Sequence, residues 1–140
     1  MREILFRGKR VDNGEWIYGD LVHWWGKHNT KPDIQIYNNV QRFNVIPETV
    51  GQYTGLRDCK RTEEYPEGQK IFEGDILEFF DRLVVVFWHT HLGCWDSNFL
   101  KFTNKGNGRD DMSPLNWDNK SKVIGNIHDN PELIGGGENA

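Results

Sequence analysis

The sequence predicts a mainly β protein: an N-terminal hairpin or small sheet, then a meander that curls into an SH3-like barrel, with little helix. Two apolar segments near the start flank the turn signal Asp12-Asn13-Gly14. Residues 83–88 are the most apolar run and are rich in β-branched side chains, which favours a central buried strand. Residues 75–102 read as three consecutive strands with tight turns, the arrangement of a meander.

The N-terminal elements follow in order along the chain. We expect a hairpin between residues 3–8 and 15–24, and both faces of its second strand carry apolar groups, which predicts partial burial on each side or a subunit contact. Residues 34–37 and 40–45 read as another pair of strands around an Asn38-Asn39 turn. Pro47 ends that pair, and Pro47 with the acidic residue that follows it is compatible with one helical turn, although we do not predict a helix there.

The second half begins with a strand from about residue 49 and a long loop from Cys59 to Lys70. Strands over 75–80, 83–88 and 94–102 follow, with turns at Asp81-Arg82 and at Gly93. We expect a flexible loop over 104–111 and a short helical turn over 112–115. A strand over 122–128 closes the predicted sheet.

The organisation predicted from these elements has three parts. Residues 1–50 form an N-terminal β region, residues 51–134 form a barrel-like β region, and residues 135–140 form a disordered tail. A chain of 140 residues suits one domain or two small lobes that share a core. Its eighteen aromatic residues supply enough apolar surface to stabilise such a core.

The charge balance argues against a free-standing duplex-DNA binder. The formal net charge is −4 and the pI is about 5.7, whereas such proteins usually carry a basic footprint. The sequence also has a local cluster of basic residues near the N-terminus, which we interpret as the solvated residues of a strand edge and a turn. Its members are Arg2, Arg7, Lys9 and Arg10.

The sequence predicts no membrane association. Residues 1–20 hold no long apolar run, and no stretch approaches the roughly 20 apolar residues of a membrane span. We therefore expect a soluble cytoplasmic protein in which Cys59 and Cys94 are free thiols.

Four segments carry a family resemblance that brackets nearly the whole chain. They are Met1-Arg2-Glu3-Ile4-Leu5-Phe6-Arg7 with Gly14-Glu15-Trp16-Ile17-Tyr18, then Gln52-Tyr53-Thr54-Gly55-Leu56-Arg57-Asp58, then Ile71-Phe72-Glu73-Gly74-Asp75-Ile76-Leu77, and last Val123-Ile124-Gly125-Asn126-Ile127-His128-Asp129-Asn130-Pro131-Glu132-Leu133. In combination they resemble the YopX family of small bacteriophage and prophage proteins. The loop over 59–70 is longer than is usual in that family, and residues 23–40 match none of its motifs.

The resemblance implies a mainly β fold and a phage origin, and hence the cytoplasm of a bacterial host. It implies no established activity, cofactor or catalytic residue. None is therefore assigned to this chain.

His89, His91 and Cys94 are the sharpest candidates for metal ligands. In a strand, two histidines two residues apart point the same way, about 7 Å apart. A zinc site needs three or four such groups, and the chain has no Cys-x-x-Cys pair. The simpler interpretation is two partly exposed histidines beside a turn.

Three tryptophans are candidates for an interface or a ligand platform: Trp16, Trp24 and Trp25. Consecutive residues of a strand face opposite sides, so Trp24 and Trp25 cannot form one flat platform. We expect one of the two to pack in the core and the other to fill a subunit contact, since Trp is enriched at the centres of interfaces.

No catalytic motif is recognisable. The chain has no nucleophile elbow and no phosphate-binding glycine loop. Glu73 and Asp75 are two residues apart, and we expect Asp75 to accept hydrogen bonds from backbone amides at a turn.

These observations support three hypotheses. The first is a non-enzymatic β interaction module that self-associates and binds a host or phage macromolecule, without a cofactor. The second is a module for single-stranded or structured nucleic acid, which would use aromatic side chains and a local basic patch. The residues of that patch are Arg2, Arg7, Lys9, Arg10, Lys27 and Lys31. The third is a metal-dependent enzyme that uses His89, His91 and acidic partners.

Overall fold

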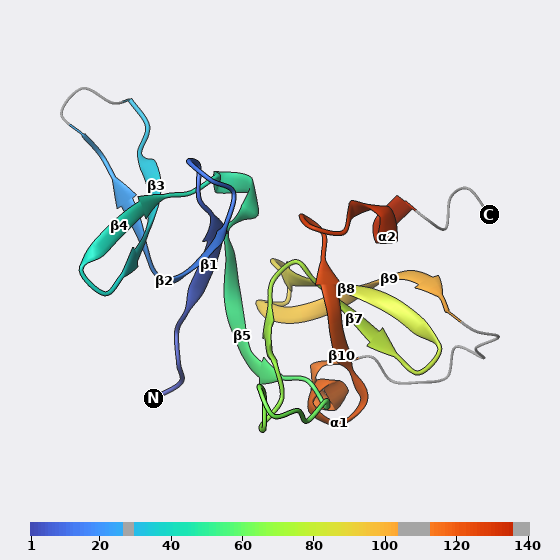
Figure 1. Cartoon of the computed structure of the whole chain (residues 1–140). Helices are drawn as coiled ribbons and strands as arrows, with labels where there is room; N and C mark the ends of the chain where they lie inside the picture. Colours follow the sequence, from blue (N-terminus) through green and yellow to red (C-terminus); the bar gives the residue numbers. More distant parts are fainter. Residues whose placement is uncertain (27–29, 104–112, 136–140) are drawn as a thin grey trace. The chain divides into compact units, whose positions relative to one another are not determined.

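The computed structural model of the chain describes residues 1–26, 30–103 and 113–135. It confirms a mainly β protein with antiparallel sheets and little helix (Figure 1). The chain divides into two compact units, Met1–Tyr53 and Thr54–Ala140. Each is described by itself.

The first unit opens with the predicted hairpin. β1 (Phe6–Lys9) pairs antiparallel with β2 (Trp16–Trp24), and Lys9 lies opposite Trp16. Gly14 adopts φ 72° in the turn, a backbone conformation that glycine reaches without steric cost. The Asn-Gly signal in the sequence therefore identified both the hairpin and its turn.

The second predicted pair of strands is also present. β3 (Asp33–Asn38) pairs with β2 on one side and with β4 (Gln41–Asn44) on the other. Asn39 turns the chain between them with φ 58°. A single helical turn, which the sequence left open at Pro47 without predicting it, is present as the 3-10 helix η1 (Pro47–Thr49), with proline in its first turn.

The core of the first unit lies on the face that the odd-numbered residues of β2 share. Ile36 and Val45 are its fully buried apolar side chains. Val45 forms an isolated bridge with Arg10, so the end of the β3–β4 hairpin meets the end of β1. Gly8 packs directly under Val45, where an added Cβ would lie 3.0 Å from the Val45 Cβ.

The second unit is built on a four-stranded antiparallel sheet in the order β10-β7-β8-β9. Its strands are β7 (Asp75–Phe79), β8 (Arg82–His89), β9 (Cys94–Phe102) and β10 (Lys122–Asn126). β5 (Gly51–Arg57) leads into this unit and β6 (Lys70–Phe72) precedes the sheet. The apolar run in the sequence is the central strand β8, as predicted, and the turn before it is Phe80-Asp81 rather than Asp81-Arg82.

The predicted SH3-like barrel is not confirmed. β7, β8 and β9 do form a meander, but the sheet stays open: β10 occupies one edge and β9 the other. A barrel requires the two edge strands to pair, and β10 instead pairs with β7. The strand over 122–126 thus extends the sheet at an edge rather than closing it.

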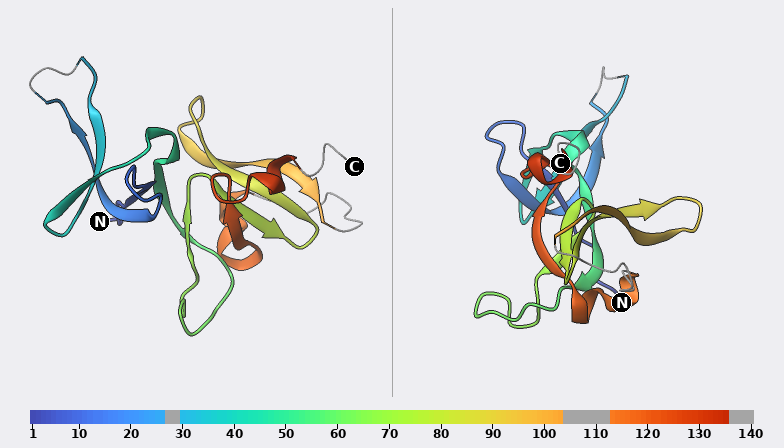
Figure 2. Two further views of the ribbon diagram at one scale, coloured as in Figure 1. Left: turned by 45° about the horizontal axis from the view of Figure 1, so that its top comes forward. Right: turned by 90° about the vertical axis from the view of Figure 1, so that its right-hand side faces the viewer.

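The main hydrophobic cluster of the second unit lies on one face of this sheet, and Ile76 and Leu83 are buried on the other face. It joins Leu77, Phe79, Val84 and Val86 of the sheet to Ile71 and Trp117. Trp117 begins the helix α1 (Trp117–Lys120), which follows the 3-10 turn η2 (Pro114–Asn116) close to the predicted helical turn. The helix α2 (Pro131–Gly135), which the sequence did not predict, follows β10 (Figure 2).

Some expectations fall on residues outside the described ranges. These are the flexible loop over 104–111, Met112, and all but the first residue of the tail over 135–140. Within the described ranges, no helix combines the length and the apolar character that crossing a membrane requires.

Candidate functional site

One face of the N-terminal sheet gathers aromatic and cationic side chains. Lys9 lies opposite Trp16 and Arg7 opposite Tyr18 across β1 and β2, and Tyr37 lies opposite Arg42 across β3 and β4. Residues directly opposite each other in antiparallel strands share a face, and so do alternate residues of one strand. We call this surface the aromatic-cationic face and define it by Arg7, Lys9, Trp16, Tyr18, Trp24, Tyr37 and Arg42.

Two cations lie over the ring of Trp16. The guanidinium carbon of Arg7 is 4.6 Å from the ring centroid and the Lys9 ammonium nitrogen is 5.5 Å from it. Arg7 is buried and Trp16 is half-buried. Such contacts stabilise a fold by about 0.5–2 kcal/mol, depending on desolvation. Trp16 is therefore held by its own strand partners and forms the inner part of the face.

Trp24 and Tyr37 form the exposed part of the face. Trp24 is 47% exposed and Tyr37 is 38% exposed. The guanidinium carbon of Arg42 lies 4.9 Å from the Trp24 ring centroid and 5.7 Å from that of Tyr37. One arginine therefore contacts both aromatic rings, and all three side chains remain accessible to a partner.

The expectation that either Trp24 or Trp25 packs in the core is wrong. Both are exposed, Trp24 by 47% and Trp25 by 59%. Trp24 is the last residue of β2 and lies opposite Asp33, the first residue of β3. The core centres further along this hairpin, at Ile36, so the end of the hairpin extends past it.

The basic residues near the N-terminus do not form one surface cluster. Arg7 is buried against Trp16, whereas Arg10 donates two hydrogen bonds to the Asp12 carboxylate, at 3.0 and 2.6 Å. The hydrogen bond from Arg10 lowers the pKa of Asp12 below its ordinary value. Arg10 also lies 4.4 Å from the Phe43 ring centroid. Its charge is therefore already engaged within the unit.

The two units differ in charge. Residues 1–53 carry seven Lys or Arg and six Asp or Glu, and residues 54–140 carry ten and fifteen. The excess of acidic over basic residues in the chain therefore lies in the second unit. The aromatic-cationic face itself carries three cations, and the exposed Asp20 and Asp33 lie on the same side of the sheet.

His89, His91 and Cys94 lie around the turn between β8 and β9. The rings of His89 and His91 are 6.2 Å apart between centroids, and His89 lies opposite Cys94 in the strand pair. Nδ1 of His89 accepts a hydrogen bond from the Leu92 amide at 3.2 Å. In the parts of the chain that the structure describes, no group of three His, Cys, Asp or Glu side chains is placed to hold a metal ion.

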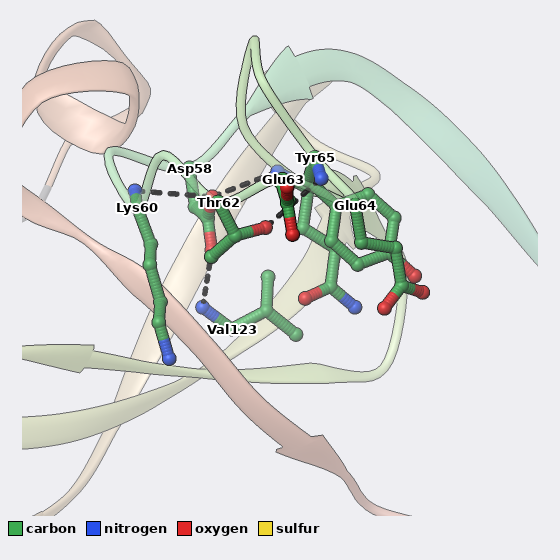
Figure 3. A pocket seen from close by; sticks show the side chains of 8 residues that line it. Asp58, Lys60, Thr62, Glu63, Glu64, Tyr65 and Val123 are labelled. Atoms are coloured by element: carbon green, nitrogen blue, oxygen red, sulfur yellow. Dashed lines mark hydrogen bonds between the residues drawn. The ribbon is translucent and has the colours of Figure 1, made fainter.

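The Asp58 carboxylate, at the end of a family-like motif, is buried and binds three backbone amides (Figure 3). Oδ1 accepts hydrogen bonds from the amides of Gln69 at 2.8 Å and Lys60 at 3.3 Å, and Oδ2 accepts one from Val123 at 2.9 Å. This side chain thus joins the end of β5, the long loop and the start of β10. Sequence reasoning gave Asp58 no such role, because a buried aspartate and a surface aspartate look alike in one sequence.

A pocket of about 440 Å³ lies over this network. Its lining residues are Asp58, Lys60, Thr62, Glu63, Glu64, Tyr65, Gln69 and Val123 (Figure 3). The Asp58 oxygens that reach it are already hydrogen-bonded to the backbone, and the rest of the polar lining comes from the surface loop. The pocket therefore offers no preorganised set of groups for catalysis.

The other family-like motifs also have structural roles. Oδ2 of Asp75 accepts a hydrogen bond from the Phe72 amide at 2.7 Å, which confirms the predicted turn contact. The Gly74 carbonyl accepts a hydrogen bond from the Ile127 amide, so the third and fourth motifs meet. Oδ1 of Asn126 accepts hydrogen bonds from the amides of His128 and Asp129 and fixes the turn after β10.

The comparisons with known proteins give one family. The family model described as "YopX protein" matches residues 5–135, which covers most of the chain and all four motif segments except residues 1–4 of the first. No curated protein matches the chain.

Proposed function

This chain belongs to the YopX family, and from that premise we propose that it is a non-enzymatic binding module that takes a protein partner on its aromatic-cationic face. The partner is a phage or host protein. The observation that carries the proposal is the contact of Arg42 with both Trp24 and Tyr37 on an accessible face.

The chemistry of the face favours a protein partner. Trp, Tyr and Arg are the residues that contribute most binding energy at protein interfaces. Arg42 stacks on the two rings and limits their rotation, which lowers the entropy lost when a partner binds. Asp20 and Asp33 on the same side repel a polyanion, and the whole chain has a net charge of −4.

The experiment is affinity capture from bacterial cells with a variant of the face and a control variant of the second unit. Tyr37→Ala combined with Arg42→Ala removes the arginine and one of the two rings that it contacts, and Tyr65→Ala removes a tyrosine of the second unit that is also 38% exposed. We expect a protein retained by the wild type and by Tyr65→Ala to be lost from the double variant. Identical captured proteins in all three samples would count against the face.

Single-stranded nucleic acid is the second candidate, because cations and aromatic rings alternate on the face. It is tested by fluorescence anisotropy with a labelled oligothymidine at low and high salt. If the oligonucleotide binds, and if this binding weakens steeply with salt and disappears in the Tyr37→Ala/Arg42→Ala double variant, the partner of the face is nucleic acid rather than a protein. Unchanged anisotropy at low salt removes this candidate.

We make no proposal of a metal-dependent activity. The rings of His89 and His91 are 6.2 Å apart between centroids, and among the described residues no group of three His, Cys, Asp or Glu side chains is placed to hold a metal ion. The self-association expected from the sequence remains part of the proposal.

A further inference from the structure

The guanidinium of Arg42 is held by aromatic rings and not by a carboxylate or a carbonyl. Its side chain is exposed and lies over Trp24 at 4.9 Å and over Tyr37 at 5.7 Å. Within the described ranges, no hydrogen bond or ion pair engages its N–H groups. Four other arginines, by contrast, donate hydrogen bonds inside the chain: Arg10, Arg57, Arg61 and Arg82.

The two rings restrain Arg42 without neutralising its charge. A cation–π contact uses the charge of a guanidinium and leaves its five N–H donors available. These donors form a rigid fork whose geometry matches that of a carboxylate. Because Trp24 and Tyr37 already restrict the side chain, less conformational entropy is lost when the fork binds a ligand.

A pocket of about 210 Å³ lies beside this arginine. Its lining residues are Val11, Asp12, Arg42, Phe43 and Asn44. The Asp12 carboxylate already accepts hydrogen bonds from Arg10. Oδ1 of Asn44 accepts one from Gln35 at 2.8 Å. Val11 and Phe43 supply apolar surface, and the volume is below that of most small-molecule sites, so the pocket suits one apolar side chain of a partner.

We infer that the protein partner places an acidic side chain on Arg42 and an adjacent apolar side chain in this pocket. The inference rests on the proposed function and names the chemistry of the partner, which is an aspartate or a glutamate next to an apolar residue. The carboxylate accepts two hydrogen bonds from the guanidinium, and Trp24 and Tyr37 keep the guanidinium in place.

The charges around Arg42 favour a single carboxylate over a run of them. Asp20 lies opposite Tyr37 and Asp33 lies opposite Trp24 in the β2–β3 pair, and both aspartates are exposed. They repel further negative charge on this face. The site therefore suits one acidic residue among apolar neighbours and disfavours a polyanion.

The first test compares three blocked peptides in an NMR titration of the full chain labelled with nitrogen-15. The peptides are acetyl-Leu-Glu-Leu-amide, acetyl-Leu-Gln-Leu-amide and acetyl-Gly-Glu-Gly-amide. We expect the first to shift the Nε–H signal of Arg42 and to bind at least about threefold more tightly than either of the others. The second peptide lacks the carboxylate, and the third lacks the apolar side chain for the pocket.

Two arginine-to-lysine variants separate the fork from its charge. Arg42→Lys keeps a cation and loses the bidentate geometry, so we expect its affinity for the Leu-Glu-Leu peptide to fall at least about threefold. Arg2→Lys is the matched control, an exposed change outside the face, and should bind this peptide like the wild type. Circular dichroism melting verifies that each variant is folded.

The capture experiment with the same variants separates this inference from the proposed function. A protein that the wild type and Arg2→Lys retain, and that Arg42→Lys and the Tyr37→Ala/Arg42→Ala double variant lose, supports both. A protein lost from the double variant and retained by Arg42→Lys leaves the proposed function standing and overturns the inference. If no protein is captured, the proposed function fails, and the peptide titration still shows whether the site takes a carboxylate.

The titration contradicts the inference in either of two results. One is an equal affinity for the Leu-Glu-Leu peptide and for either of the other two peptides. The other is an affinity for the Leu-Glu-Leu peptide that Arg42→Lys leaves unchanged.

Discussion

The carboxylate of Asp58 accepts a hydrogen bond from the backbone amide of Val123 at 2.9 Å, across 65 positions of the chain. The two residues belong to the second and fourth of the motifs that the sequence shares with its family. The third and fourth motifs meet in the same way, through the Gly74 carbonyl and the Ile127 amide. These motifs thus hold the second unit together, which explains why they carry no recognisable chemistry.

Replacing Asp58 with alanine should strongly destabilise the protein. The change leaves the partly buried amides of Gln69 and Val123 without an acceptor, at about 1–3 kcal/mol for each. We expect the free energy of unfolding to fall by about 3 kcal/mol in urea denaturation. Glu64→Ala, an exposed change in the same pocket, should stay within about 0.5 kcal/mol of wild type. Similar losses in both variants would contradict the role of Asp58.

Gly19 should not tolerate a side chain. A Cβ at this position would lie 1.8 Å from the Tyr37 carbonyl oxygen, so β2 and β3 would have to separate. We expect Gly19→Ala to cost about 2 kcal/mol or more in the free energy of unfolding. Gly14→Ala is the matched control: its Cβ meets no atom within 4 Å, and its φ of 72° alone costs about 1 kcal/mol. An equal or smaller loss for Gly19→Ala would show that the strands do not approach so closely.

Asp12 should titrate below the ordinary range of an aspartate. The hydrogen bond from Arg10 stabilises its charged form and lowers its pKa. A lowered pKa in the folded state stabilises the fold above the ordinary pKa, and this contribution is lost as the pH falls through the lowered value. An NMR titration of the Asp12 carboxyl should show the low pKa, and Arg10→Ala should raise it toward the ordinary value. No change on removing Arg10 would reject the pairing.

Arg7 and Trp16 should be energetically coupled. The guanidinium lies 4.6 Å from the ring centroid and Arg7 is buried, so the cation–π contact is partly desolvated. A double-mutant cycle with Arg7→Met and Trp16→Leu should give a coupling energy of about 1 kcal/mol. The same cycle with Lys9→Met should give a smaller value, because its nitrogen is 5.5 Å away. Coupling energies in the reverse order would mean that Lys9, not Arg7, holds the ring.

The sequence predicted the parts of the fold that local signals determine. Asn13-Gly14 and Asn38-Asn39 marked two turns, and the apolar run of β8 marked the central strand. It did not predict the open sheet, because the position of β10 beside β7 depends on pairing between distant segments. It also missed Arg42, whose contacts with Trp24 and Tyr37 require the twisted β2–β3–β4 sheet rather than any spacing in the sequence.

The candidate site was predicted by residue type and not by arrangement. Tryptophan content drew attention to Trp16, Trp24 and Trp25, but only the strand register places Trp16 and Trp24 on one face with Tyr37. The two-histidine pattern correctly located a turn at the end of β8. A metal site requires a third ligand from elsewhere in the fold, which no single sequence reveals.

The most direct test of the binding face is site-specific photo-crosslinking in bacterial cells. A benzophenone amino acid replaces Tyr18 or Tyr37 on the face, or Tyr65 in the second unit as the control of matched exposure. We expect a discrete protein to be cross-linked from positions 18 and 37 and not from position 65. Adducts that nuclease treatment removes would identify nucleic acid as the partner of the face. The same adducts from all three positions, or none from positions 18 and 37, would show that the face does not bind a protein partner.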